Sequence, residues 1–71
     1  MKLVQEAEKL VAKTYPGYVI GTQICRVFAP TVGIEWSVGL GLMGRPLWFG
    51  RGQTIEEATC NAMKEFKACH Q

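Results

Sequence analysis

A regular alternation of residue types over residues 34–43 is the feature that most constrains the fold. Every second residue is large and apolar, and the residues between are mostly small or polar. Because successive side chains of a strand point to opposite faces, this pattern predicts a strand with one buried face. That face needs a covering layer of other elements. The apolar set is Ile34, Trp36, Val38, Leu40 and Leu42, and the alternating set is Glu35, Ser37, Gly39, Gly41 and Met43.

Extended runs precede and follow this strand. Residues 18–28 are rich in β-branched and aromatic types, which predicts a first strand. Its alternation is imperfect, since apolar residues occur at both parities (Ile20 and Ile24, but also Cys25 and Val27), so a bulge or an edge position is expected. Residues 29–33 form a connection and residues 43–46 a turn. A short third strand is predicted at residues 47–49, followed by Gly50-Arg51-Gly52.

Two amphipathic helices are predicted, at residues 2–14 and 55–69. In both, apolar residues recur at spacings of three and four. The first helix stops before Pro16-Gly17, and the second begins with a capping box made by Thr54 and Glu57. The expected buried stripes are Leu3, Val4, Ala7, Leu10, Val11 and Thr14 in the first helix, and Ile55, Ala58, Ala62, Phe66 and Cys69 in the second.

The order helix, strand, strand, strand, helix predicts an α+β fold. A three-stranded antiparallel sheet is expected to carry both helices on one face. The 71 residues make a single domain, residues 1–71, with room for one thin core. The net charge of +2, from eight basic residues and six glutamates, does not by itself indicate nucleic acid. No stretch resembles a signal peptide or reaches the ~20 apolar residues of a membrane helix, so we expect a cytoplasmic protein without a membrane partner.

No cofactor or metal is expected. The spacing of Gly39, Gly41 and Gly44 matches a dinucleotide-binding fingerprint, but a strand rather than a helix follows it, and the motif works only before a helix. Cys60 and Cys69 lie nine residues apart on one helix, hence on opposite faces, and cannot share a zinc ion. Cys25 and Cys69 are interpreted as small core residues, and Cys60 as a half-exposed thiol.

An enzymatic function is not expected either. Nucleophilic catalysis needs a base held beside a cysteine or serine. The one histidine, His70, is the penultimate residue, where chains usually fray. Ser37 and Glu35 sit within the second strand and have no evident catalytic partner.

The spacing of Gly50, Gly52, Thr54, Ala58 and Ala62 resembles the last third of the double-stranded-RNA-binding domain family. That family enters its second helix through Gly-x-Gly-x-Ser-Lys-Lys-x-Ala-Lys-x-x-Ala, and its α-β-β-β-α order is similar over nearly the whole chain. The resemblance implies the same fold. The family's phosphate-clamping lysines correspond here to Ile55, Glu56 and Thr59, so tight binding of double-stranded RNA is not expected.

The leading hypothesis is a small non-enzymatic protein-interaction module, either an adaptor or an inhibitor of a larger partner. Tryptophan, methionine and arginine are enriched in interfaces and gather around residues 43–51. If Leu47 and Phe49 face the core, Trp48 points outward and lies across bare glycine backbone; the opposite phase, with Trp48 inside, stays open. The expected protein-binding residues are Gly39, Gly41, Met43, Arg45, Trp48 and Arg51.

Two alternatives stay open beside this hypothesis. The first is an RNA- or DNA-binding module that uses Arg26, Arg45, Arg51, Lys64 and Lys67. The second is a homodimeric structural module whose sheet edge or apolar face binds a second copy.

Overall fold

Both helices form where the sequence patterns place them. The computed structural model describes residues 2–31 and 33–70. Helix α1 spans Lys2–Thr14 and helix α2 spans Ile55–Cys69, in agreement with the predicted ranges. The chain leaves α1 through Gly17, whose φ of 88° lies in the left-handed region that favours glycine. At the start of α2 the Glu57 backbone N–H donates a 3.0 Å hydrogen bond to the Thr54 hydroxyl, so the predicted cap is present.

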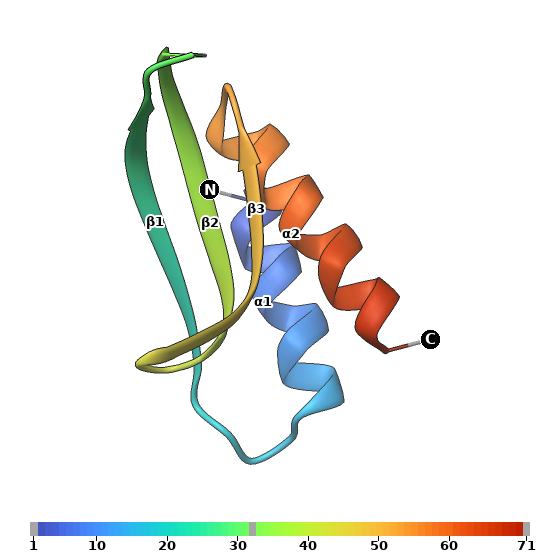
Figure 1. Ribbon diagram of the computed structural model, residues 1–71. Helices are drawn as coiled ribbons and strands as arrows, with labels where there is room; N and C mark the ends of the chain where they lie inside the picture. The colour runs from blue at the N-terminus through green and yellow to red at the C-terminus, as the bar shows by residue number, and fades with distance from the viewer. Residues whose placement is uncertain (1, 32, 71) are drawn as a thin grey trace.

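The three strands form one antiparallel sheet in the order β1-β2-β3 (Figure 1). Strand β1 spans Ile20–Ala29, β2 spans Gly33–Leu42 and β3 spans Arg45–Gly52. The β1–β2 pairing is unbroken, whereas the β2–β3 register shifts between Leu40 and Gly41. Of the two explanations for the irregular first strand, the edge position is therefore the right one, because β1 is an edge strand and the bulge lies on the other side of β2.

Strand β3 is longer than the three residues predicted. It begins at Arg45, so Pro46 belongs to the strand and the turn shrinks to Met43-Gly44, with Gly44 at a φ of 76°. Proline is tolerated there because β3 is the other edge of the sheet, where one row of N–H groups has no partner strand.

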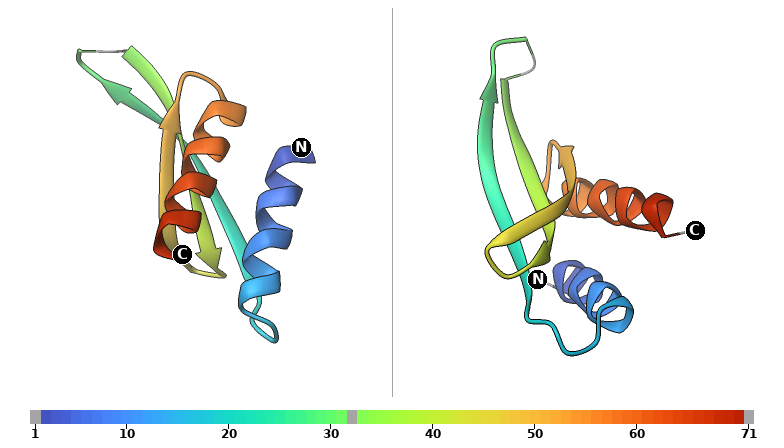
Figure 2. Two further views of the ribbon diagram at one scale, coloured as in Figure 1. Left: turned by 90° about the vertical axis from the view of Figure 1, so that its right-hand side faces the viewer. Right: turned by 60° about the horizontal axis from the view of Figure 1, so that its bottom comes forward.

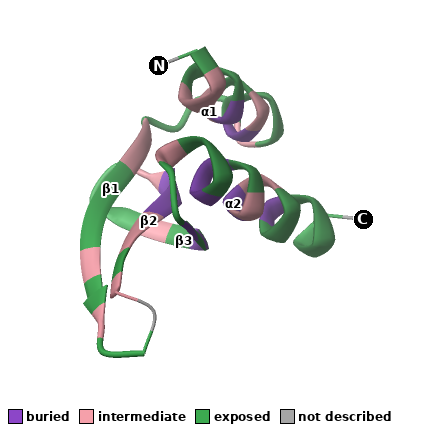
Figure 3. Ribbon diagram, turned by 90° about the horizontal axis from the view of Figure 1, so that it is seen from above, coloured by how far each residue is buried: buried purple, intermediate pink, exposed green. Residues whose placement is uncertain are grey.

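Both helices cover the same face of the sheet, as predicted (Figure 2). Helix α2 packs against β3 and β2, and α1 packs against β1, β2 and α2. We call this the inner face and the opposite one the outer face, which carries no helix. The core lies between the inner face and the helices (Figure 3). Its buried apolar residues are Ala7, Val11, Val38, Leu40, Trp48, Ala58, Ala62 and Phe66.

Two glycines allow α2 to lie directly on β3. A Cβ added to Gly50 would stand only 2.2 Å from the Ala62 backbone nitrogen and 2.3 Å from the Ala58 carbonyl oxygen. At Gly52 it would meet the Ala58 nitrogen at 2.8 Å. Strand and helix backbones therefore touch here, and a side chain at either strand position would prevent this contact. This contact is the physical reason for the glycine and alanine spacing noted in the sequence.

Four residues predicted to be buried are exposed. Ile34 lies on the inner side of β2 but is 50% exposed. Cys25 faces outward, because its partner across the sheet is Ser37 and no helix covers that face. Cys69 is exposed in the last turn of α2, where the His70 ring instead stacks on Phe66. Thr14, at the end of α1, is exposed and its hydroxyl donates to the Leu10 carbonyl at 3.2 Å. Cys60, expected to be half-exposed, is exposed.

Candidate functional site

Trp48 lies in the core, so the outward phase favoured for the third strand is wrong. Trp48 pairs with the buried Leu40 on the inner face and is 7% exposed. Phe49 pairs with Gly39 and is 52% exposed, while Leu47 is 45% exposed. The register places one large side chain from this part of β3 on the inner face, and that side chain is the indole of Trp48.

The Trp48 indole is enclosed by three other rings. Its centroid lies 4.8 Å from the Phe66 ring, 5.1 Å from the His70 ring and 5.8 Å from the Tyr15 ring. The Phe66 contact is edge-on, a geometry favoured by the ring quadrupoles. These contacts join β3 to the ends of both helices, so Trp48 stabilises the fold and does not offer a surface anchor.

His70 is held in place rather than frayed. Its Nδ1 lies 2.7 Å from the Phe66 carbonyl oxygen, which can only accept, so this nitrogen carries a proton. Its Nε2 lies 2.7 Å from the Tyr15 hydroxyl. The ring thus binds one of the unpaired carbonyls at the end of α2 and links it to the residue after α1. Sequence reasoning missed this role because 55 residues separate the two partners.

A phenylalanine occupies the position expected for the tryptophan on the outer face. A Cβ added to Gly39 would lie 3.0 Å from a Phe49 ring carbon and 3.0 Å from the Pro46 Cβ. The Phe49 ring therefore lies over Gly39, whose backbone it helps to bury. The glycine backbone predicted to be bare beside the third strand is therefore covered. Phe49 and Pro46 lie over Gly39, and the backbone of residues 45–47 lies over Gly41, so both glycines are buried.

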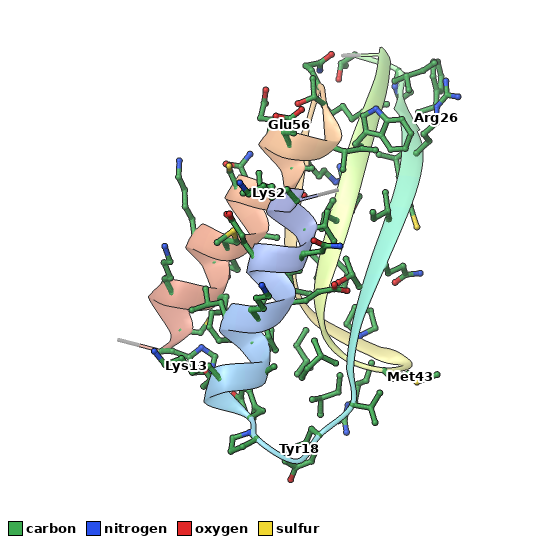
Figure 4. All side chains as sticks on the ribbon, turned by 180° about the vertical axis from the view of Figure 1, so that it is seen from behind. Lys2, Lys13, Tyr18, Arg26, Met43 and Glu56 are labelled. Carbon is green, nitrogen blue, oxygen red and sulfur yellow. The ribbon has the colours of Figure 1, made fainter. Side chains whose placement is uncertain are left out.

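Exposed apolar side chains continue from Phe49 to the tip of the β2–β3 hairpin. Met43 at the tip is 73% exposed, and Figure 4 shows it standing away from the helices. We call this set of residues the hairpin patch: Met43, Pro46, Leu47 and Phe49. A pocket of about 410 Å³ adjoins it, lined by residues of the β2–β3 turn and the first half of β1: Gly21, Thr22, Gln23, Leu42, Met43, Gly44 and Pro46.

Two exposed arginines stand at the ends of β3. Arg45 opens the strand beside the tip of the hairpin, opposite Leu42. Arg51 lies on the outer face opposite Ser37, and its carbonyl accepts a 2.6 Å hydrogen bond from the Asn61 side chain. Of the six predicted protein-binding residues, three are exposed on the β2–β3 hairpin: Met43, Arg45 and Arg51. Gly39 and Gly41 are buried on the same hairpin, and Trp48 lies in the core.

The cations of the nucleic-acid alternative do not form one surface. Arg26 lies on the inner side of β1, with its guanidinium 5.7 Å from the Trp36 ring centroid (Figure 4). Arg51 is on the outer face, and Lys64 and Lys67 are on exposed positions of α2. At the start of α2, where the RNA-binding family has lysines, Glu56 is exposed.

The side chains considered for catalysis or metal binding lie on β1, β2 and α2. Cys25 on β1 and the two cysteines of α2, Cys60 and Cys69, are free and exposed. In residues 2–31 and 33–70 no three potential metal-ligating side chains come together. Ser37 and Glu35 are half-buried on the outer side of β2.

Comparisons with known proteins add no family. Within the described part of the chain, neither helix is long and apolar enough to cross a membrane. No protein-family model, no curated protein and no solved structure matches this chain.

Proposed function

We propose that this chain is a non-enzymatic protein-interaction module, an adaptor or an inhibitor, that binds a larger protein through the hairpin patch. The observation that carries the proposal is the exposure of Met43, Leu47 and Phe49 on one hairpin. Phe49 lies on the outer face, which no helix covers, and exposed apolar residues that gather on one element commonly mark an interaction site.

The composition and rigidity of the hairpin patch favour a protein partner. Aromatic residues, methionine and arginine are enriched in interfaces, and the apolar centre of an interface is commonly ringed by polar groups. Here Phe49 and Met43 supply exposed apolar area, Arg51 lies with Phe49 on the outer face, and Arg45 stands beside the hairpin tip. Because Phe49 rests on the backbone of Gly39, little side-chain freedom is lost on binding.

Nucleic-acid binding ranks second. The α-β-β-β-α order and the contact of Gly50 and Gly52 with α2 support the resemblance to double-stranded-RNA-binding domains. The charges do not support the same function, because Glu56 and Glu57 occupy the first turn of α2 and would repel phosphate. The resemblance therefore supports the fold, and the hairpin patch supports the proposed function.

The test compares variants that alter the patch with a variant matched in exposure. Phe49→Ala and Met43→Ala, used as baits for affinity capture with mass spectrometry, should lose the proteins that the unmodified chain captures. Ile34→Ala is the control, because Ile34 is 50% exposed but lies on the inner side of β2, away from the patch. All three variants should keep their far-ultraviolet circular dichroism.

Three outcomes would contradict the proposal. Capture by Phe49→Ala and Met43→Ala at the level of the unmodified chain would exclude the hairpin patch as the binding site. Loss with Ile34→Ala alone would move the site to the inner side of the β1–β2 hairpin. Loss of every captured protein after nuclease treatment would favour the nucleic-acid function.

A further inference from the structure

The free edge of β1 lacks the features that normally keep edge strands from pairing. Such edges are commonly protected by proline, by several charges, by a bulge or by a covering loop. Over the ten residues Ile20–Ala29 there is no proline, and Arg26 is the single charged residue. The register against β2 has no irregularity, and within the described ranges no other strand pairs with this edge. In the sheet order β1 is the first strand, on the side of β2 away from β3 (Figure 1).

The register identifies the backbone groups that point away from β2. The Met43 N–H donates to the Val19 carbonyl at 2.9 Å, which fixes the phase of the alternating antiparallel ladder. Since the register continues without a break, the odd-numbered residues of β1 bond to β2. The even-numbered residues therefore direct their N–H and C=O groups to the free edge: Ile20, Thr22, Ile24, Arg26 and Phe28.

The side chains of these same residues form a symmetric pattern. They lie on the inner side of β1 and read apolar, polar, apolar, polar, apolar, with Ile24 at the centre. A two-fold antiparallel pair matches each residue with its mirror position in the sequence. Around Ile24, apolar residues would then face apolar residues, and Thr22 would face Arg26. The edge is complementary to itself.

We propose that a second copy of this chain pairs antiparallel along β1, with Ile24 opposite Ile24 of the second copy, and so forms a continuous six-stranded sheet. Ile20 then lies opposite the second copy's Phe28, a residue that is 75% exposed in the single chain. This interface uses neither the β2–β3 hairpin nor the outer face, so it is independent of the proposed function.

Charge complementarity supports this register. The Thr22 hydroxyl donates a 2.7 Å hydrogen bond to the Glu8 carboxylate of α1. Pairing around Ile24 sets the second copy's Arg26 directly across from Thr22, with about 5 Å between Cβ atoms, which is within reach of a long side chain. The guanidinium can then form an ion pair with Glu8, and the two-fold axis creates this pair twice.

Shape complementarity points the same way. Helix α1 stands beside the first half of β1, whereas the second half extends beyond the helices as part of the β1–β2 hairpin (Figure 2). Antiparallel pairing places the uncovered half of one copy beside the α1-covered half of the other. Ile24, which is 43% exposed, and Phe28 would thereby lose contact with water.

The neighbouring registers fit less well. Pairing around Cys25 would oppose Ile24 to Arg26 and Thr22 to Phe28, which sets polar against apolar twice. Pairing around Arg26 would oppose two like charges, and pairing around Thr22 would leave Phe28 without a strand partner. The Ile24 register is the one that satisfies both the apolar and the charged positions.

Sedimentation equilibrium tests the association. The unmodified chain should show a concentration-dependent mass that approaches twice 7.9 kDa. Ile24→Lys puts two ammonium groups at the two-fold axis and should weaken dimerisation at least about tenfold. Leu47→Lys, an apolar-to-lysine change at a similarly exposed position on β3 at the other edge of the sheet, should leave it unchanged. A single-chain mass at all concentrations up to about 1 mM, or equal weakening by both substitutions, would overturn the proposal.

A charge exchange tests the contact across the interface. Glu8→Arg and Arg26→Glu should each raise the dissociation constant about tenfold, and the double variant should restore it to within about threefold. Glu6→Arg makes the same charge change on an exposed position of α1 and serves as the control. If both single variants dimerise poorly and the double variant does not regain the dissociation constant of the unmodified chain, the Glu8–Arg26 pair and its register are excluded.

An engineered disulfide across the interface tests the register directly. Gln23 and the second copy's Cys25 form a non-hydrogen-bonded pair in the Ile24 register, where Cα atoms stand about 4.5 Å apart, a separation that a disulfide spans. In a background with Cys60→Ser and Cys69→Ser, Gln23→Cys should give a covalent dimer on mild oxidation. A covalent dimer that forms equally well without Gln23→Cys would place Cys25 opposite Cys25 and overturn the register.

Discussion

Replacing Gly50 with alanine tests the contact between β3 and α2 on which the core depends. The added methyl group would lie 2.2 Å from the Ala62 nitrogen and 2.3 Å from the Ala58 carbonyl oxygen. Carbon and backbone atoms normally keep at least 3 Å apart, so the strand and the helix must separate by about an ångström or more. Neither obstacle is a side chain that can rotate away.

The expected cost follows from this geometry. Overpacking a core costs about 1–3 kcal/mol where side chains can adjust, so a backbone-to-backbone clash belongs at or above about 3 kcal/mol. A chain of 71 residues has a free energy of unfolding of roughly 4–11 kcal/mol. At about 4–8 °C per kcal/mol for a domain of this size, Gly50→Ala should lower Tm by about 12–24 °C.

Thermal and urea unfolding followed by circular dichroism measure this difference. The matched control is Gly44→Ala, because a Cβ at Gly44 meets nothing within 4 Å while the positive φ of 76° adds strain of about 1–2 kcal/mol. Gly50→Ala should therefore be clearly less stable than Gly44→Ala. If Gly50→Ala unfolds within about 1 kcal/mol of the parent, α2 does not lie on β3 as described, and the packing argument fails.

Four further outcomes are expected. Trp48→Ala should lower the free energy of unfolding by about 3–5 kcal/mol, since it removes the indole between Tyr15 and Phe66. A Tm close to that of the parent would indicate that Trp48 lies on the surface. Phe66→Ala should cost a similar amount, about 3–5 kcal/mol, and a shift of only a degree or two would show that Phe66 is not a core residue. Thr54→Ala should cost about 1 kcal/mol through loss of the α2 cap, which urea unfolding measures against Thr54→Ser as the conservative control. Tight binding of double-stranded RNA is not expected, because Glu56 and Glu57 occupy the start of α2; nanomolar binding at physiological salt that weakens steeply with added salt, in a gel-shift titration, would refute this.

The helices were predictable because their signals are local. Residue periodicity, the Pro16-Gly17 stop and the Thr54 cap each act within a few residues, and α1 and α2 have the predicted ends. The same holds for β2, whose alternation predicts the buried Val38 and Leu40. These patterns describe one element at a time and need no knowledge of its neighbours.

The phase of β3 was not predictable because its neighbours decide it. Leu47, Trp48 and Phe49 are all large and apolar, so the strand has no amphipathic pattern of its own. The register shift at Leu40 and Gly41 then sets which side chain points inward. Without that register, Trp48 and Phe49 are equally good candidates for the outer face.

The aromatic cluster was hidden for a different reason. The contact between Tyr15 and His70 joins the residue after α1 to the residue after α2, and neither has a local pattern that signals it. Sequence position suggested a frayed histidine, whereas tertiary packing holds its ring against Phe66 at 4.1 Å between centroids. Contacts of this kind depend on the crossing of the two helices.

The contact between β3 and α2 can form only late in synthesis, because α2 leaves the ribosome after all three strands. All three strands are synthesised before α2, yet α2 supplies Ala58, Ala62 and Phe66, which cover Trp48 and Leu40. Until those residues emerge, only α1 can cover the apolar side of the nascent sheet, and the edge along β1 is open. We expect the domain to fold late and in one step after α2 is released, and the interval before that step to be when the nascent chain most needs a chaperone.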